Sequence, residues 1–206
     1  MRLRRVANKK GEKMGTRGAY GFRLNGKDKV TYNHFDSYMD GLGRAVLNFI
    51  RGTATKELRQ IAKRIKLVSK DKPATMKQVE DCIEMSDTTV NNGKLTDWYV
   101  LLRKAQGNPN VYKDGLKYMI NGAKFLADSL FCEWAYIINL DKEVLEIYVG
   151  FNKDPSAKGR YACIRNKNDV YEYHGVRLLA ELKLSDIREM SEKDIEAYCK
   201  ATDRLL

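Results

Sequence analysis

The chain has 206 residues, of which 43% are hydrophobic, which is enough for a packed core in one or two domains. We expect neither a membrane span nor a secretory signal, because no apolar run approaches roughly 18 residues and no apolar segment follows the basic N-terminus. Four scattered cysteines and two histidines predict free or buried thiols without a zinc site or cofactor, in the cytoplasm, and the net charge of +11 favours a polyanionic partner.

The positive charge is concentrated in two segments. Residues 1–13 carry six basic side chains against one acid, and residues 51–72 carry eight against two, so these segments account for the whole excess of +11. Residues 1–13 lack any periodic pattern, which predicts a disordered basic arm or an alternative start before Met14. The remaining residues, 14–206, are predicted to form a single domain.

The first elements of this domain are predicted to be a β-hairpin and a short helix. Residues 17–24 and 29–34 flank Asn25-Gly26, the strongest short signal for a hairpin turn, because both residues tolerate positive φ. Residues 44–51 then place apolar side chains at helical spacing after a glycine-rich turn.

Residues 55–70 predict an amphipathic basic helix with apolar residues on one face and cations on another. Phosphate binding is one interpretation of the basic face, and a solvated face of a core-packed helix is the other. Because no aromatic residue interleaves the cations, we expect backbone contact without base stacking by this helix. The candidate nucleic-acid-binding residues are Lys56, Arg59, Lys63, Arg64, Lys66 and Lys70.

The middle of the chain is predicted to be helical. Thr75 can cap a helix over residues 75–85, and Thr96 can cap another that ends near Gln106, before Gly107. A further helical pattern covers residues 112–130, weakened by its glycines.

The last part of the chain predicts strands and a terminal helix. In residues 133–151, large apolar side chains alternate with polar or smaller ones on both sides of an Asp141-Lys142 turn, which predicts a second hairpin with one buried face. Residues 160–165 and 176–184 predict further strands, and Ser191 opens a helix. This order favours an α+β fold with a mostly antiparallel sheet and a helical middle segment, with two layered sheets as a variant.

The densest polar cluster follows the first hairpin, over residues 31–38. Strand alternation predicts that His34 and Asp36 lie on one side, where they can orient each other, and that Asn33 lies on the other. The alternative is a turn network in which Asp36 or Ser37 caps the next helix.

Several runs resemble an uncharacterised group of bacteriophage and microbial proteins that begin at the methionine corresponding to Met14. These runs are residues 14–23, residues 31–38 with the Gly41-Leu42-Gly43 turn, and residues 133–141 with 146–151, so the resemblance extends over most of residues 14–151. It implies a viral or prokaryotic context and supplies no settled activity. It also implies that residues 1–13 are an added or alternative start.

Some members of that group carry cysteine where this chain has Gly15, and their opening is similar to that of choloylglycine-hydrolase-like amidases with an N-terminal nucleophile. This weaker similarity implies a layered N-terminal-nucleophile-like fold and places Gly15, Arg17 and Asp36 at the matching positions. In such enzymes the thiol attacks the substrate, so glycine removes the attacking atom. The chain therefore departs from the pattern at its decisive residue, and we lean against an enzyme.

Three functions follow from the sequence. The first is a non-enzymatic phage-type accessory protein that binds nucleic acid or a nucleoprotein through the basic segment and modulates host or defence functions. The second is an amidohydrolase with a site of Arg17, Asn33, His34 and Asp36. The third is a structural protein of a viral particle.

Overall fold

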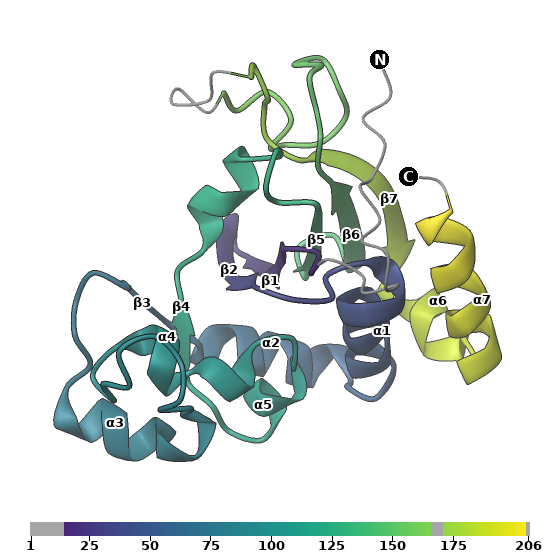
Figure 1. Cartoon of the computed structure of the whole chain (residues 1–206). Coiled ribbons are helices and arrows are strands. Elements are labelled where there is room, and N and C mark those ends of the chain that lie inside the picture. Colours follow the sequence, from purple (N-terminus) through teal and green to yellow (C-terminus); the bar gives the residue numbers. More distant parts are fainter. Residues whose placement is uncertain (1–14, 166–170, 205–206) are drawn as a thin grey trace, which may run out of the picture.

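The computed structural model describes residues 15–165 and 171–204 and confirms an α+β fold with a mostly antiparallel sheet (Figure 1). The predicted basic arm, residues 1–13, lies outside the described residues. The main sheet has the order β2-β1-β5-β6-β7, in which β1 and β5 run parallel and the other neighbouring strands run antiparallel. Its strands are β1 (Gly18–Leu24), β2 (Lys27–Asn33), β5 (Trp134–Asn139), β6 (Val144–Val149) and β7 (Arg177–Lys183).

The first hairpin, β1 and β2, forms as predicted. Asn25 and Gly26 both have positive φ, 53° and 71°, as a tight turn between twisted strands requires. The carboxylate of Asp141, in the turn of the second hairpin, accepts the N–H groups of Asn25 at 2.7 Å and Gly26 at 2.9 Å. These backbone hydrogen bonds lower the pKa of Asp141. One carboxylate therefore joins the two hairpin turns at the same end of the sheet.

The two faces of the sheet are buried against different parts of the chain. Apolar side chains such as Phe22, Tyr136 and Leu145 pack against the helices in the larger core. On the opposite face, Ala135 and Tyr148 belong to a smaller core with Tyr161, which comes from the long connection between β6 and β7. The predicted second hairpin forms as β5 and β6, but it is buried on both faces and not on one, because the β6–β7 connection covers the second face.

Three helices pack together beside the sheet: α1 (Arg44–Arg51), α6 (Leu184–Glu189) and α7 (Glu192–Asp203) (Figure 1). A single π-helical turn, η1 (Met39–Gly43), leads into α1. Ser191 caps α7 as predicted, in a capping box with Asp194.

The helical middle segment is shorter and more broken than predicted. Thr75 does cap α3 through a capping box with Gln78, but Asp97, one residue after the predicted Thr96, caps α4. The helices are α2 (Thr55–Arg64), α3 (Met76–Cys82), α4 (Trp98–Leu101) and α5 (Asn110–Lys113), with single turns η2 (Ile83–Met85), η3 (Arg103–Ala105) and η4 (Ala123–Ala127).

A second, two-stranded sheet replaces two predicted helical stretches. Its parallel strands are β3 (Lys66–Val68) and β4 (Tyr118–Ile120). The chain turns from helical to extended at Ile65, and the N–H of Lys66 donates to the carbonyl of Lys117 at 2.7 Å. The predicted helix over residues 55–70 is therefore wrong beyond Arg64. The predicted helix over residues 112–130 is wrong for most of its length, since only its first two residues belong to an α-helix and only η4 forms a short turn within it. Pairing between distant segments overrides local helical periodicity here.

The predicted strand over residues 160–165 is also wrong. This segment forms turns, with one isolated bridge between Arg165 and His174. Tyr161 is nevertheless buried, because it packs against the sheet in the smaller core, so its burial does not require a strand. Cys82, Cys132, Cys163 and Cys199 are free thiols. Within the described ranges, the helices are too short and polar for any to cross a membrane.

Candidate nucleic-acid interface

The six predicted nucleic-acid-binding residues do not form one helical face. Lys56, Arg59, Lys63 and Arg64 lie on α2, whereas Lys66 lies in β3 and Lys70 in the turn after it. The predicted basic face is therefore divided between a helix, a strand and a turn.

Two of the six cations are occupied within the fold. Arg59 donates to the carbonyl of Leu140 and forms an ion pair with Glu143 at 3.0 Å, so it joins α2 to the second hairpin. Arg64 donates to the carbonyl of Tyr112. Both guanidinium groups thus stabilise the packing of α2.

The other four cations are available to a ligand. Lys56, Lys63, Lys66 and Lys70 are exposed and form no ion pair with any residue in the described ranges. No carboxylate offsets the positive potential of such a lysine, so an external anion can bind it without competition.

The polar cluster after β2 forms a turn network. Asn33, which is 3% exposed, donates from Nδ2 to the carbonyl of Phe35 and to Oγ of Ser37 at 2.8 Å. Asp36 has a positive φ of 47°, and its carbonyl accepts the N–H of Leu42. This network directs the chain from the sheet edge into η1.

His34 and Asp36 do not meet as strand alternation predicted, because β2 ends at Asn33 and the chain then turns. His34 Nδ1 instead lies 2.6 Å from Oη of Tyr32, and its ring packs edge-on against Phe35 with centroids 4.3 Å apart. Burial, followed by the charges of Arg103 and Arg17, lowers the pKa of His34. The protonated form of the imidazole is therefore disfavoured at this position.

The cap of η1 comes from the other end of the chain. The carboxylate of Asp203, at the end of α7, accepts the N–H of Met39 at 2.9 Å and the N–H of Asp40 at 3.1 Å. The side chains of Asp36 and Ser37, which the sequence favoured as caps, do not bond to the N–H groups that open this turn.

Gly15 and Arg17 lie at the start of the described chain. Gly15 is exposed, and a Cβ placed on it would lie 3.1 Å from Cδ1 of Phe35. Asp36 lines a separate small cavity of about 370 Å³ with Arg103 and Gly107, and Gly15 is not among the lining residues. Gly15 thus does not line this cavity, although it contacts Phe35, which lines the cavity together with Asp36.

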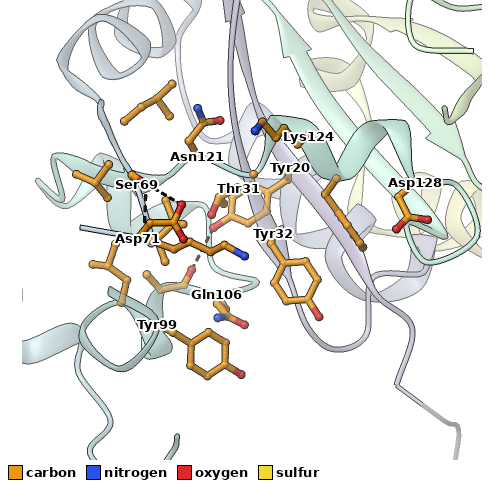
Figure 2. Close-up of a pocket in the computed structure, with 18 of the residues that line it drawn as sticks. Tyr20, Thr31, Tyr32, Ser69, Asp71, Tyr99, Gln106, Asn121, Lys124 and Asp128 are labelled. Atoms are coloured by element: carbon orange, nitrogen blue, oxygen red, sulfur yellow. Dashed lines mark hydrogen bonds between the residues drawn. The ribbon is translucent and has the colours of Figure 1, made fainter. Parts of the chain in front are cut away.

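A larger cleft of about 1010 Å³ lies beside the edge strand β2. Figure 2 shows Asn121 and Lys124 on one side of it and Tyr99 and Gln106 on the other, with Tyr32 between them. The lining comes from both sheets and from the segments of α4, η3 and η4. Its polar and aromatic lining residues include Tyr20, Thr31, Tyr32, Ser69, Lys70, Asp71, Tyr99, Gln106, Tyr112, Asn121, Lys124, Phe125 and Asp128.

Aromatic rings cluster around Tyr32 at this cleft. Tyr32 packs edge-on against Phe125, with ring centroids 5.0 Å apart. Arg103 lies with its Cζ 5.4 Å from the ring centroid of Tyr99 and 4.9 Å from that of Phe35. Phe35 itself is 49% exposed. Phe35 and Tyr99 are thus linked through one guanidinium group.

Arg17 extends this arrangement. Its Cζ lies 4.8 Å from the ring centroid of Phe131, which is 43% exposed. Arg17 and Arg103 both act electrostatically on Tyr32 and His34, so both guanidinium groups lie near that pair. Arg17 forms no ion pair with a carboxylate of the described chain.

A buried ionic network on the sheet face opposite the helices was missed by sequence reasoning. Glu146, only 1% exposed, forms an ion pair with Arg160 and accepts hydrogen bonds from Asn139 at 2.7 Å and Tyr148 at 3.1 Å. Alternation along β6 indicated only that Glu146 faces away from the helices. No local sequence pattern predicts that the β6–β7 connection covers Glu146 and buries it.

Asp28 continues the network at the sheet edge. It forms ion pairs with Arg23 at 2.9 Å and Arg160 at 3.4 Å, and it accepts the hydroxyl of Tyr161 at 2.8 Å. Because these groups bond to one another, we assign the network to anchoring the long β6–β7 connection on the sheet.

No group of His, Cys, Asp and Glu side chains in the described part of the chain could hold a metal ion. Comparisons with protein-family models, with curated proteins and with solved structures find no match to this chain.

Proposed function

We propose that this chain is a non-enzymatic nucleic-acid-binding protein whose ligand contacts the exposed lysines of residues 56–70 and enters the neighbouring cleft. The observation that carries this proposal is the continuity of the two features. Lys70 belongs to the basic segment and also lines the cleft.

The electrostatic part of the proposal depends on four lysines. Lys56, Lys63, Lys66 and Lys70 lack intramolecular ion pairs in the described residues, so binding a phosphate does not require an existing pair to break. Each phosphate that a lysine neutralises releases condensed counterions, which favours binding at low salt. Arg59 and Arg64 hold α2 in place and contribute indirectly.

An accessory role in a phage-infected or microbial cytoplasm is part of this proposal and is supported only by the resemblance of residues 14–151. The binding activity does not depend on that context. The amidohydrolase alternative has no comparable support, because Gly15 supplies no attacking atom and does not line the cavity that Asp36 lines.

The proposal is tested by fluorescence anisotropy with labelled oligonucleotides over a range of salt concentrations. Four phosphate contacts give a log–log slope of about −3 on a single strand and about −4 on a duplex. Simultaneous reversal of Lys56, Lys63, Lys66 and Lys70 to glutamate should abolish binding at about 50 mM salt, because counterion release supplies the nonspecific affinity.

A matched control separates local contact from net charge. Reversal of four exposed lysines outside the basic segment, Lys77, Lys94, Lys183 and Lys193, changes the net charge equally. We expect this variant to retain most of its affinity. Absence of binding by the unmodified protein at about 50 mM salt, where nonspecific phosphate binding is strong, refutes the proposed function. Equal losses in the two variants would refute the assignment to this surface.

A further inference from the structure

The structure points to a more specific ligand: we infer that the cleft beside β2 takes unpaired bases of a single-stranded nucleic acid. The bases stack on Tyr99 in the cleft lining and on Phe35 in the adjoining small cavity, which shares Gln106 with the cleft. This inference rests on the proposed function and narrows its ligand class.

The first support is the accessibility of the rings. Phe35 is about half exposed, and Tyr99 lies partly exposed in the cleft lining. The guanidinium group of Arg103 lies over both rings. Proteins that bind single strands use such rings as platforms, because every base has a π-face and the arginine adds a cation–π contribution. A duplex keeps its bases stacked inside and offers none to these rings.

The second support is the set of cations around the cleft. Arg17 and Arg103 lie near the Tyr32–His34 pair, where their charges can meet phosphates. The cleft lining adds the exposed Lys70 and Lys124 beside the carboxylates of Asp71 and Asp128. These cations can contact the phosphates of a strand whose uncharged bases stack on the rings.

The third support is the polar lining within the cleft. Thr31, Gln106 and Asn121 supply a hydroxyl and two side-chain amides, groups that hydrogen-bond base edges. The cleft volume of about 1010 Å³ lies at the upper end of the range of roughly 300–1,000 Å³ for ligand pockets. The cleft is therefore larger than one nucleobase requires. The cleft therefore offers both stacking and edge contacts to unpaired bases.

Three labelled probes test the inference on the unmodified protein: a deoxythymidine strand of about 12 nucleotides, an abasic strand of equal length and a duplex of equal length. The abasic strand keeps the phosphates and removes the bases. We expect the thymidine strand to bind at least about 5-fold more tightly than the abasic strand, as one base–aromatic stack provides. The duplex should also bind more weakly.

Two variants locate the effect. Tyr99→Leu and Phe35→Leu should each weaken binding of the thymidine strand by about 5- to 150-fold and leave binding of the abasic strand unchanged. Tyr171→Leu removes an exposed ring, 62% accessible, that lines neither the cleft nor the adjoining small cavity, and it should change the binding of neither strand. Thermal melts confirm that each variant is folded.

The outcomes separate the two proposals. Equal affinity for the thymidine and abasic strands, or tighter binding of the duplex, overturns the inference of base stacking and leaves the proposed nucleic-acid binding intact. The same holds if Tyr99→Leu and Phe35→Leu are folded and bind normally. Failure of all three probes to bind at low salt overturns both proposals and leaves the cleft to a protein ligand.

Discussion

The cap that Asp203 supplies to η1 tests how the C-terminal helix α7 stabilises the turn that follows the first hairpin. Replacing Asp203 with alanine removes both acceptors of the Met39 and Asp40 N–H groups, at 2.9 and 3.1 Å. No side chain within η1 or just before it offers a replacement cap. The N–H groups at the start of this turn would then depend on water, near a fully buried Met39 side chain.

The expected loss of stability is about 2 kcal/mol. Removing a helix cap costs about 0.5–2 kcal/mol, and hydrogen bonds to a charged group contribute about 1.5–3 kcal/mol. Two such bonds at a partly buried position place Asp203 near the top of the range for caps. For a chain of this length, each kcal/mol changes Tm by about 2–4 °C, so we expect a decrease of about 4–8 °C.

The assay is urea unfolding and thermal melting of Asp203→Ala beside Asp36→Asn. The second variant removes the carboxylate that the sequence favoured as a cap, and asparagine tolerates the positive φ of 47° at this position. We expect its free energy of unfolding to change by less than about 0.5 kcal/mol. An unchanged Tm for Asp203→Ala, or an equal loss in Asp36→Asn, would show that the cap reasoning is wrong.

Three further predictions concern other parts of the molecule. Glu146→Gln breaks the buried ion pair with Arg160, so denaturant unfolding should show that the free energy of unfolding falls by about 3 kcal/mol. This value is at the lower end for buried ion pairs because Arg160 keeps its ion pair with Asp28. A loss under about 1 kcal/mol would contradict a structural role. In NMR titrations His34 should titrate below the usual value of about 6.5, because burial and the charge of Arg103 lower its pKa, and Arg103→Gln should raise the midpoint. Since the pKa of His34 is lower in the folded state, the unfolded chain binds the extra proton. The contribution of His34 to stability should therefore fall as pH decreases from the unfolded pKa to the folded pKa. A titration midpoint of His34 at or above the usual value would argue against this environment. Thr75→Ala removes the capping box of α3 and should lower the free energy of unfolding by about 1 kcal/mol in urea melts, whereas no change would mean that α3 does not depend on its cap.

The sequence by itself determined the elements whose signals are local. The turn at Asn25-Gly26, the caps at Thr75 and Ser191, and the alternation of the second hairpin all depend on residues within a few positions of one another. The α+β class follows from the order of these elements. The excess of lysine and arginine in residues 51–72 is likewise a property of the sequence.

Only the tertiary structure decided the elements and sites that join distant segments. The basic helix ends at Arg64 because Lys66–Val68 pairs with Tyr118–Ile120, and the resulting two-stranded sheet borders the cleft. Which cations remain available was also decided there, since Arg59 is held by Glu143 and the four lysines are not. The same holds for the cap from Asp203 and for the rings of Phe35 and Tyr99 that Arg103 links. Local propensities are small, up to about 1 kcal/mol per residue for residues other than proline, so pairing and burial between remote segments outweigh them without leaving a local pattern.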